Sequence, residues 1–104
     1  MSRKMNPDAA RWIAALNHPL RRHILRILGE TEIASATEIA RQKELRLGNV
    51  AYHVKVLADL EVLELVHQRK VRGASEKFYR STAANGDGSW VAVVLERTRQ
   101  SDPD

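Results

Sequence analysis

The stretch that decides the fold is SATEIARQKELRLGNVAYHVKVL, residues 35–57. It opens with a capping box, in which Ser35 accepts a hydrogen bond from the Glu38 amide and the Glu38 side chain accepts one from the Ser35 amide. A short helix carrying Ile39 is expected there. A second helix follows almost at once, because apolar residues recur at spacings of three and four, namely Leu47, Val50, Val54, Leu57 and Leu60. Two short helices joined this closely predict a helix-turn-helix.

A β-hairpin is predicted directly after these helices. Its first strand contains an apolar, partly β-branched run, Val62, Leu63, Leu65 and Val66. Residues 69–75 form a polar turn in which Gly73 supplies a positive φ, and residues 77–80 form the return strand. An isolated two-stranded hairpin is only marginally stable, so this one is expected to pack against the helices.

Helices are also predicted on both sides of this central region. Asn-Pro-Asp at residues 6–8 caps and starts a helix that runs to about residue 17. Pro19 starts the next helix, which Gly29 is expected to end. A terminal helix over residues 89–100 follows a Gly-rich connector and precedes a frayed tail. This order of elements predicts a mainly α-helical fold with a small two-stranded β-hairpin, a winged helix-turn-helix.

The charge of the chain favours a polyanionic partner. The 104 residues fit one domain, and the net charge is +4. Apolar residues make up 43% and charged residues 29%, which is ordinary globular composition. Positive charge gathers in residues 41–80, whereas residues 81–104 are acidic. In the second helix, Arg21, Arg22 and Arg26 lie mostly outside the apolar face and are expected in solvent.

Several function classes lack support in the sequence. The chain has no cysteine, which excludes disulfides, thiolate metal sites and a nucleophilic thiol. It contains no phosphate-cradling glycine loop and neither an HExxH nor a GxSxG motif, so we do not expect an enzyme. Apolar runs of the length of a signal peptide or a membrane span are also missing, so we expect a soluble, cytoplasmic protein that contacts no membrane.

The second helix of the helix-turn-helix carries the candidate DNA-reading residues. With Val50, Val54 and Leu57 buried, the remaining arc holds Gly48, Asn49, Ala51, Tyr52, His53 and Lys55. An asparagine can pair bidentately with adenine, and an alanine can contact the thymine methyl group. Two alternatives stay open at this point: Tyr52 could lie half-buried against the hairpin, and His53 could be an ordinary solvated residue. Further candidates flank the turn, Arg41, Lys43 and Arg46, or lie at the hairpin tip, Arg69, Lys70 and Arg72.

Two separated motifs resemble ArsR-type bacterial regulators. ALNHPLRRHIL at residues 15–25 is similar to the opening signature of that family, and LGNVAYHVKVL at residues 47–57 is similar to its recognition helix. The resemblance covers residues 12–82 and implies that the basic hairpin is a wing touching the minor groove or phosphates. The cysteine ligands and the terminal-helix Asp and His ligands through which many members sense metals are missing here. Two remaining histidines, His18 and His23, are five residues apart and poorly placed to share one helix face. We therefore expect no metal site and no cofactor.

A dimer seam is predicted on the first and terminal helices. A terminal helix of this length is marginal alone in water, so its apolar stripe must pack against something. The expected seam residues are Trp12, Leu16, Trp90, Val93 and Val94. The alternative is that Trp90 folds back onto its own domain. Residues 1–82 are thus assigned to the winged helix-turn-helix and residues 89–100 to a dimerisation helix of the same domain.

The leading functional hypothesis is a homodimeric, sequence-specific transcriptional regulator, acting as a repressor on an inverted-repeat operator in double-stranded DNA. The alternative is a winged-helix module that binds another protein and does not read DNA. The effector, the operator sequence and the regulated genes do not follow from these residues.

Overall fold

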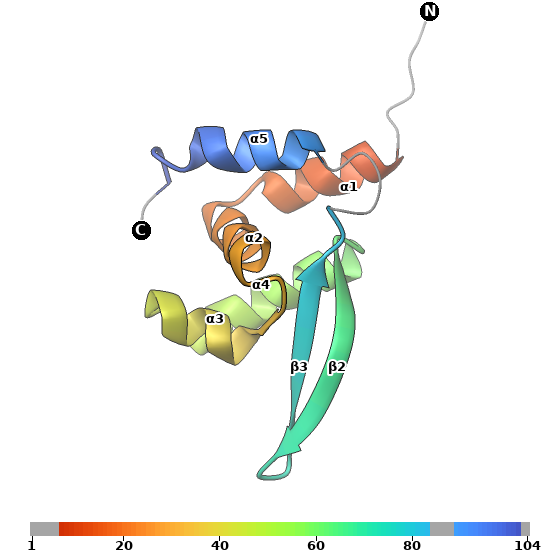
Figure 1. Cartoon of the computed structure of the whole chain (residues 1–104), viewed down its shortest axis with the longest axis vertical. Helices are drawn as coiled ribbons and strands as arrows, with labels where there is room; N and C mark the ends of the chain where they lie inside the picture. The colour runs from red at the N-terminus through yellow and green to blue at the C-terminus, as the bar shows by residue number, and fades with distance from the viewer. Residues whose placement is uncertain (1–6, 84–88, 103–104) are drawn as a thin grey trace, which may run out of the picture.

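The computed structural model describes residues 7–83 and 89–102. Within them the elements are α1 (Pro7–Leu16), α2 (Pro19–Thr31), β1 (Ala34–Ser35), α3 (Ala36–Lys43), α4 (Leu47–Asp59), β2 (Leu63–Val71), β3 (Ala74–Ser81) and α5 (Ser89–Thr98). The hairpin of β2 and β3 projects from one end of the molecule, and α5 lies across the opposite end (Figure 1). The expected mainly helical architecture with a hairpin is confirmed. The predicted cap at Asn6 and most of the Gly-rich connector lie outside the described residues.

The corner between α1 and α2 is built from the motif at residues 15–25. His18 caps α2, its Nδ1 atom accepting a hydrogen bond from the Leu20 amide at 3.0 Å. Arg21 and Arg22 donate back to the last carbonyls of α1, including a 2.6 Å bond from Arg22 Nη1 to Leu16 O. Helix C-termini leave such carbonyls without helical partners, so these arginines complete α1 while they fix its angle to α2.

The second helix is longer than predicted. Gly29 does not end α2, which continues to Thr31 and closes with a positive φ of 71° at Glu32. Glycine is tolerated inside a helix at a modest cost, and the apolar face just before Gly29 is anchored in the core. Here tertiary packing outweighs the local breaker.

The helix-turn-helix is confirmed at its predicted position. Ser35 and Glu38 form both hydrogen bonds of the capping box, each 3.1 Å long. Glu44 ends α3 in the left-handed conformation, with a φ of 53°, and the chain re-enters a helix at Leu47. The buried side of α4 consists of Val50, Val54 and Leu57, as the spacing predicted.

The sheet has one strand more than predicted. The antiparallel order is β1-β3-β2, and β1 pairs Ala34 and Ser35 with Tyr79 and Phe78. Two residues are too few to show an alternating pattern, and only the approach of β3 makes them a strand. At the hairpin tip, Arg72 and Gly73 have φ values of 53° and 84°, so the positive φ expected of Gly73 is confirmed. Positive φ at both central residues is what a type I′ hairpin turn requires.

The core joins every helix to the base of the sheet. Its largest fully buried apolar side chains come from α2, α3, α4, α5 and the start of the hairpin, namely Ile24, Leu25, Ile27, Ile39, Val50, Leu57, Val62 and Val91. Trp12 and Leu16, predicted at the dimer seam, are only 8% and 7% exposed within the single chain. They belong to the chain's own core and leave little surface for a partner.

The C-terminal end is tied to α2 by a buried ion-pair cluster. Asp102 Oδ2 accepts from Arg22 Nε at 2.8 Å and from Arg26 Nη2 at 2.7 Å, and its Oδ1 accepts from Arg22 Nη2 at 2.6 Å. Arg26 also donates to Thr98 Oγ1 and to Leu95 O on α5. The prediction of solvated arginines is therefore wrong for Arg22 and Arg26. The predicted fraying is likewise wrong as far as Asp102, because a carboxylate this well bonded holds the end of the chain.

Candidate nucleic-acid interface

The outer face of α4 is open to solvent. Gly48, Asn49, Ala51, Tyr52 and Lys55 are all exposed, opposite the buried apolar side. Tyr52 is 64% exposed, which overturns the alternative that it lies half-buried against the hairpin. A Cβ atom added at Gly48 would meet nothing within 4 Å, so the protein's own packing does not require glycine there. The first turns of α4 therefore present an unobstructed surface with amide, hydroxyl and ammonium groups.

His53 departs from this open face. Its ring centroid lies 4.3 Å from that of His18, and its Nδ1 atom lies 3.5 Å from Arg21 Nη1. Burial lowers the pKa of His53, and the charges of His18 and Arg21 lower that pKa further. His53 is half-buried, so the solvated alternative does not describe it, and its DNA contact stays a prediction. It joins α4 to the corner between α1 and α2.

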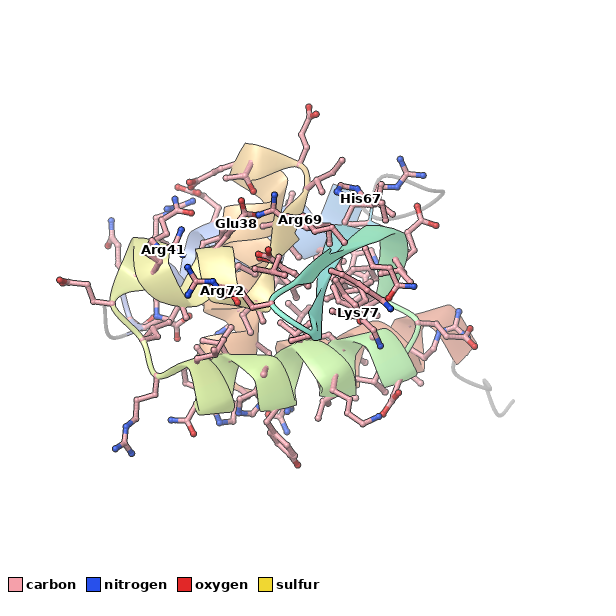
Figure 2. All side chains as sticks on the ribbon, turned by 90° about the horizontal axis from the view of Figure 1, so that it is seen from below. Glu38, Arg41, His67, Arg69, Arg72 and Lys77 are labelled. Atoms are coloured by element: carbon pink, nitrogen blue, oxygen red, sulfur yellow. The ribbon has the colours of Figure 1, made fainter. Side chains whose placement is uncertain are left out.

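The basic residues around the turn and the hairpin tip are all exposed, and one of them is also paired with a carboxylate. Arg41, Lys43, Arg46, Lys70 and Arg72 are exposed. Figure 2 places Arg41, Arg72 and Lys77 on the face seen from below, above the line of α4. Arg69 is exposed as well, but it is paired with a neighbouring carboxylate. Exposed basic side chains thus come from two separate parts of the chain, and their contacts with DNA stay a prediction.

Arg69 and Glu76 form a cross-strand pair. The two residues are direct partners in the register of β2 and β3, and Arg69 Nη2 lies 3.0 Å from Glu76 Oε1. Glu76 Oε2 accepts a 2.6 Å hydrogen bond from Ser35 Oγ. That hydroxyl, followed by Arg69, holds the pKa of Glu76 below its ordinary value, and the charge of Arg41 acts in the same direction. Glu76 therefore stays ionised between the hairpin and α3.

A cleft of about 520 Å³ separates the hairpin from α4. Its walls include Thr37 of α3, Ala51 and Lys55 of α4, and Ser75 and Lys77 of β3. Lys55 Nζ lies 3.3 Å from Asp59 Oδ2, and both side chains are mostly exposed.

Lys77 was not among the residues predicted to contact DNA, because it lies outside the polar turn of the hairpin. Strand alternation carries the missing signal, since Ser75, Lys77 and Tyr79 share one face of β3.

Two features are absent from the described ranges, residues 7–83 and 89–102, namely a metal-binding cluster and a membrane-spanning helix. No group of three or more His, Asp or Glu side chains there could hold a metal ion. Among the same residues, each helix is too short or too polar to cross a membrane.

Comparison with known proteins places this geometry in a wider group. Residues 16–66 match the family described as a helix-turn-helix domain, which is no enzyme class. A crystal structure of a possible transcriptional regulatory protein from Mycobacterium bovis, fragment 1–100, shares 19% identity and a TM-score of 0.64, covering 89% of this chain and 91% of that one. A solution structure from the same organism, a homodimeric winged helix-turn-helix DNA-binding domain of a possible ArsR-family regulator, shares 17% identity and a TM-score of 0.64, covering 100% and 94%.

The chain is a winged helix-turn-helix domain. Its wing consists of β2, β3 and the turn between them, and α4 is the second helix of its helix-turn-helix. The fold that the resemblance implied is confirmed by the likeness to these solved structures. No curated protein is significantly similar to the chain.

An apolar surface remains at the end of the winged helix-turn-helix domain opposite the wing. Ile13 of α1 is 50% exposed and Val93 of α5 is 52% exposed, whereas Trp90 and Val94 are half-buried. Trp90 packs partly against the chain's own core, so the fold-back alternative describes part of its surface. Ile13 was missing from the predicted seam, although it takes the exposed position beside the buried Trp12.

Proposed function

We propose that this domain belongs to a transcriptional regulator of the ArsR type, which binds an inverted-repeat operator as a homodimer and represses transcription. One observation carries the proposal: the open face of α4 and the basic wing tip lie on the same side of the molecule (Figure 2). A recognition helix in the major groove and a wing on the neighbouring backbone need that arrangement.

Each exposed group has a chemical role in this proposal. Asn49 reads adenine through its two hydrogen-bonding atoms, Ala51 contacts a thymine methyl group and Tyr52 reaches a base edge or phosphate. The remaining proposed contacts go to the sugar-phosphate backbone and come from Arg41, Lys43, Arg46, Gly48, Lys55, Lys70 and Arg72. His53 is omitted because it is half-buried beside His18 and Arg21. Arg69 is omitted because its carboxylate partner, Glu76, is only 15% exposed, whereas both members of the Lys55–Asp59 pair are mostly exposed.

Dimerisation would let two copies of the domain bind the two half-sites of the operator. One recognition helix per chain offers few base contacts, and a two-fold axis through α1 and α5 would set two copies of α4 on one side of the DNA. Ile13, Trp90, Val93 and Val94 are the apolar groups available for that seam.

Binding to duplex DNA at two salt concentrations tests the proposed function. A 30-base-pair operator selected from a random library should be an inverted repeat with half-site centres about 10 base pairs apart. The association constant should fall steeply between about 50 and 200 mM salt, since phosphate binding releases counterions. Affinity that is weak and insensitive to salt would favour the alternative, a winged-helix module that binds protein.

Val93→Glu tests the seam. The added carboxylate would be buried against its symmetry mate, so we expect a monomer in sedimentation equilibrium and at least a roughly tenfold loss of operator affinity. Val71→Glu is the matched control for the sedimentation measurement alone, because Val71 is similarly exposed and lies near the wing tip, at the end of the molecule opposite the seam. If Val93→Glu dimerised as tightly as the control variant, this seam would be excluded.

A further inference from the structure

One carboxylate links the wing to the first helix of the helix-turn-helix. Glu76 uses both oxygens: Oε1 accepts from Arg69 Nε at 3.1 Å and from Arg69 Nη2 at 3.0 Å, while Oε2 accepts from Ser35 Oγ. Its side chain is 15% exposed, far less than the 64% of its arginine partner. The pairing of β1 with β3 reaches only to Phe78, and the bond from Ser35 to Glu76 adds an attachment two residues nearer the wing tip. This link further limits the angle of the hairpin.

The Ser35 hydroxyl both accepts and donates a hydrogen bond in this network. Its oxygen accepts the Glu38 amide at 3.1 Å as the N-cap of α3, and its single proton goes to Glu76. The continuous chain of bonds runs from Arg69 through Glu76 and Ser35 to the first turn of α3. The position of the wing is thereby coupled to the helix that precedes the recognition helix.

Arg69 is held along the wing by its other contacts as well. Its guanidinium carbon lies 5.5 Å from the centroid of the Phe78 ring, and that ring stacks on His67 at 4.4 Å. In Figure 2, Arg69 lies on the side of the wing that faces α3, Arg72 lies at the tip, and Lys77 lies on the side that faces α4. The two wing arginines therefore have different environments, although only three positions separate them.

We propose that Glu76 is the positioning residue of the wing: it withholds Arg69 from DNA and sets the hairpin angle at which Arg72 meets the backbone. This inference rests on the proposed DNA-binding function. An unpaired arginine at position 69 would add a phosphate contact that every sequence offers. Glu76 would therefore increase the ratio of operator affinity to affinity for random DNA, at the expense of total affinity.

The first test compares two arginines of one wing in the full chain. Arg69→Gln and Arg72→Asn each remove one positive charge, and asparagine suits the positive φ of position 72. We expect the slope of log K against log salt to become shallower by about 0.9 for Arg72→Asn and to stay nearly unchanged for Arg69→Gln. Equal decreases in the two variants would show that Arg69 contacts phosphate and would overturn the proposal.

The second test removes the carboxylate charge. Glu76→Gln keeps the size and one acceptor oxygen, and we expect a steeper salt slope by about 0.9, roughly threefold or more tighter binding of random duplex, and a lower operator-to-random ratio. Glu64→Gln is the matched control, because Glu64 pairs across the same two strands with Arg80. Identical behaviour of the two glutamine variants, or uniform weakening in Glu76→Gln without a change of slope, would overturn the positioning role.

The outcomes separate this inference from the proposed function. A wild-type chain without salt-dependent DNA binding contradicts the function itself. A wild-type chain that binds DNA normally, with Arg69 and Arg72 equivalent, contradicts only the role of Glu76. If Glu76→Gln fails to fold, as judged by circular dichroism, the comparison of the two arginine variants still decides.

Discussion

The two ends of the molecule use arginine in opposite ways. At the α5 end, Arg22 and Arg26 are enclosed and share the carboxylate of Asp102 at distances between 2.6 and 2.8 Å. At the wing end, Arg41 and Arg72 remain exposed. A net charge of +4 does not distinguish these groups. The difference teaches that pairing and burial, rather than the number of basic residues, locate a surface able to meet a polyanion.

The largest expected effect comes from a substitution at the enclosed end, and it is a loss of stability. Arg26→Ala leaves Asp102 buried with one partner fewer and removes the bonds to Thr98 and Leu95. Truncating one member of a buried pair commonly costs about 3 to 5 kcal/mol, so we expect a loss of unfolding free energy in that range by urea denaturation. Arg99→Ala is the control, because Arg99 is half-exposed in its pairs and should cost at most about 1 kcal/mol. Equal losses would erase the contrast between the two ends.

The next effect concerns the open end and changes specificity rather than stability. Asn49→Ala should relax the preference at one or two positions of each half-site by about 1 to 3 kcal/mol, because a bidentate contact to adenine is lost. The measurement is competition between operator variants. The unfolding free energy should stay within about 0.5 kcal/mol of wild type, as for an exposed substitution. An unchanged sequence preference would mean that another part of α4 reads the bases.

Arg72→Asn sharpens the comparison with Arg26. Loss of one exposed charge at the wing tip should weaken binding to operator and random duplex by a similar factor, on the order of threefold to tenfold near 0.1 M salt. Stability should be unchanged or slightly improved, because Asn-Gly is a favourable pair for this turn. A loss of stability comparable to that of Arg26→Ala would show that the tip also has a structural role.

The smallest expected effect is a pH dependence concentrated at the enclosed end. Bonds from Arg22 and then Arg26 hold the pKa of Asp102 well below its ordinary value, so this pair stabilises the fold above about pH 4, and the stabilisation is lost as the pH falls further. The lowered pKa of His53 acts in the same direction below about pH 6.5. Wild type and Asp102→Asn should therefore differ most at neutral pH in urea unfolding, and the difference should narrow as the pH falls below about 4. A constant difference would contradict the ionised pairing.

Local patterns account for most of the elements. The capping box at Ser35, the spacing of Val50, Val54 and Leu57, and the turn at Gly73 each depend on residues that are near neighbours in the chain. Their physics is local hydrogen bonding, helix periodicity and backbone φ, all of which can be read from residue order. The exposed face of α4 followed from the same periodicity, so most of the candidate site was predictable.

The remaining features depend on contacts between residues that are far apart in the sequence. Residue order alone could not show that Asp102 would pair with Arg22 and Arg26, which lie at the other end of the sequence. It could not show that Ala34 and Ser35 would form a strand beside β3. It also gave no sign that His53 would lie against His18. It also could not assign Arg69 to Glu76 and leave Arg72 free, since both are basic residues of one turn segment. The sequence determined which segments became helices and hairpin, because those choices rest on neighbours. The fold decided which charges stayed available, because a charge is neutralised only by the group that packing brings within hydrogen-bond distance.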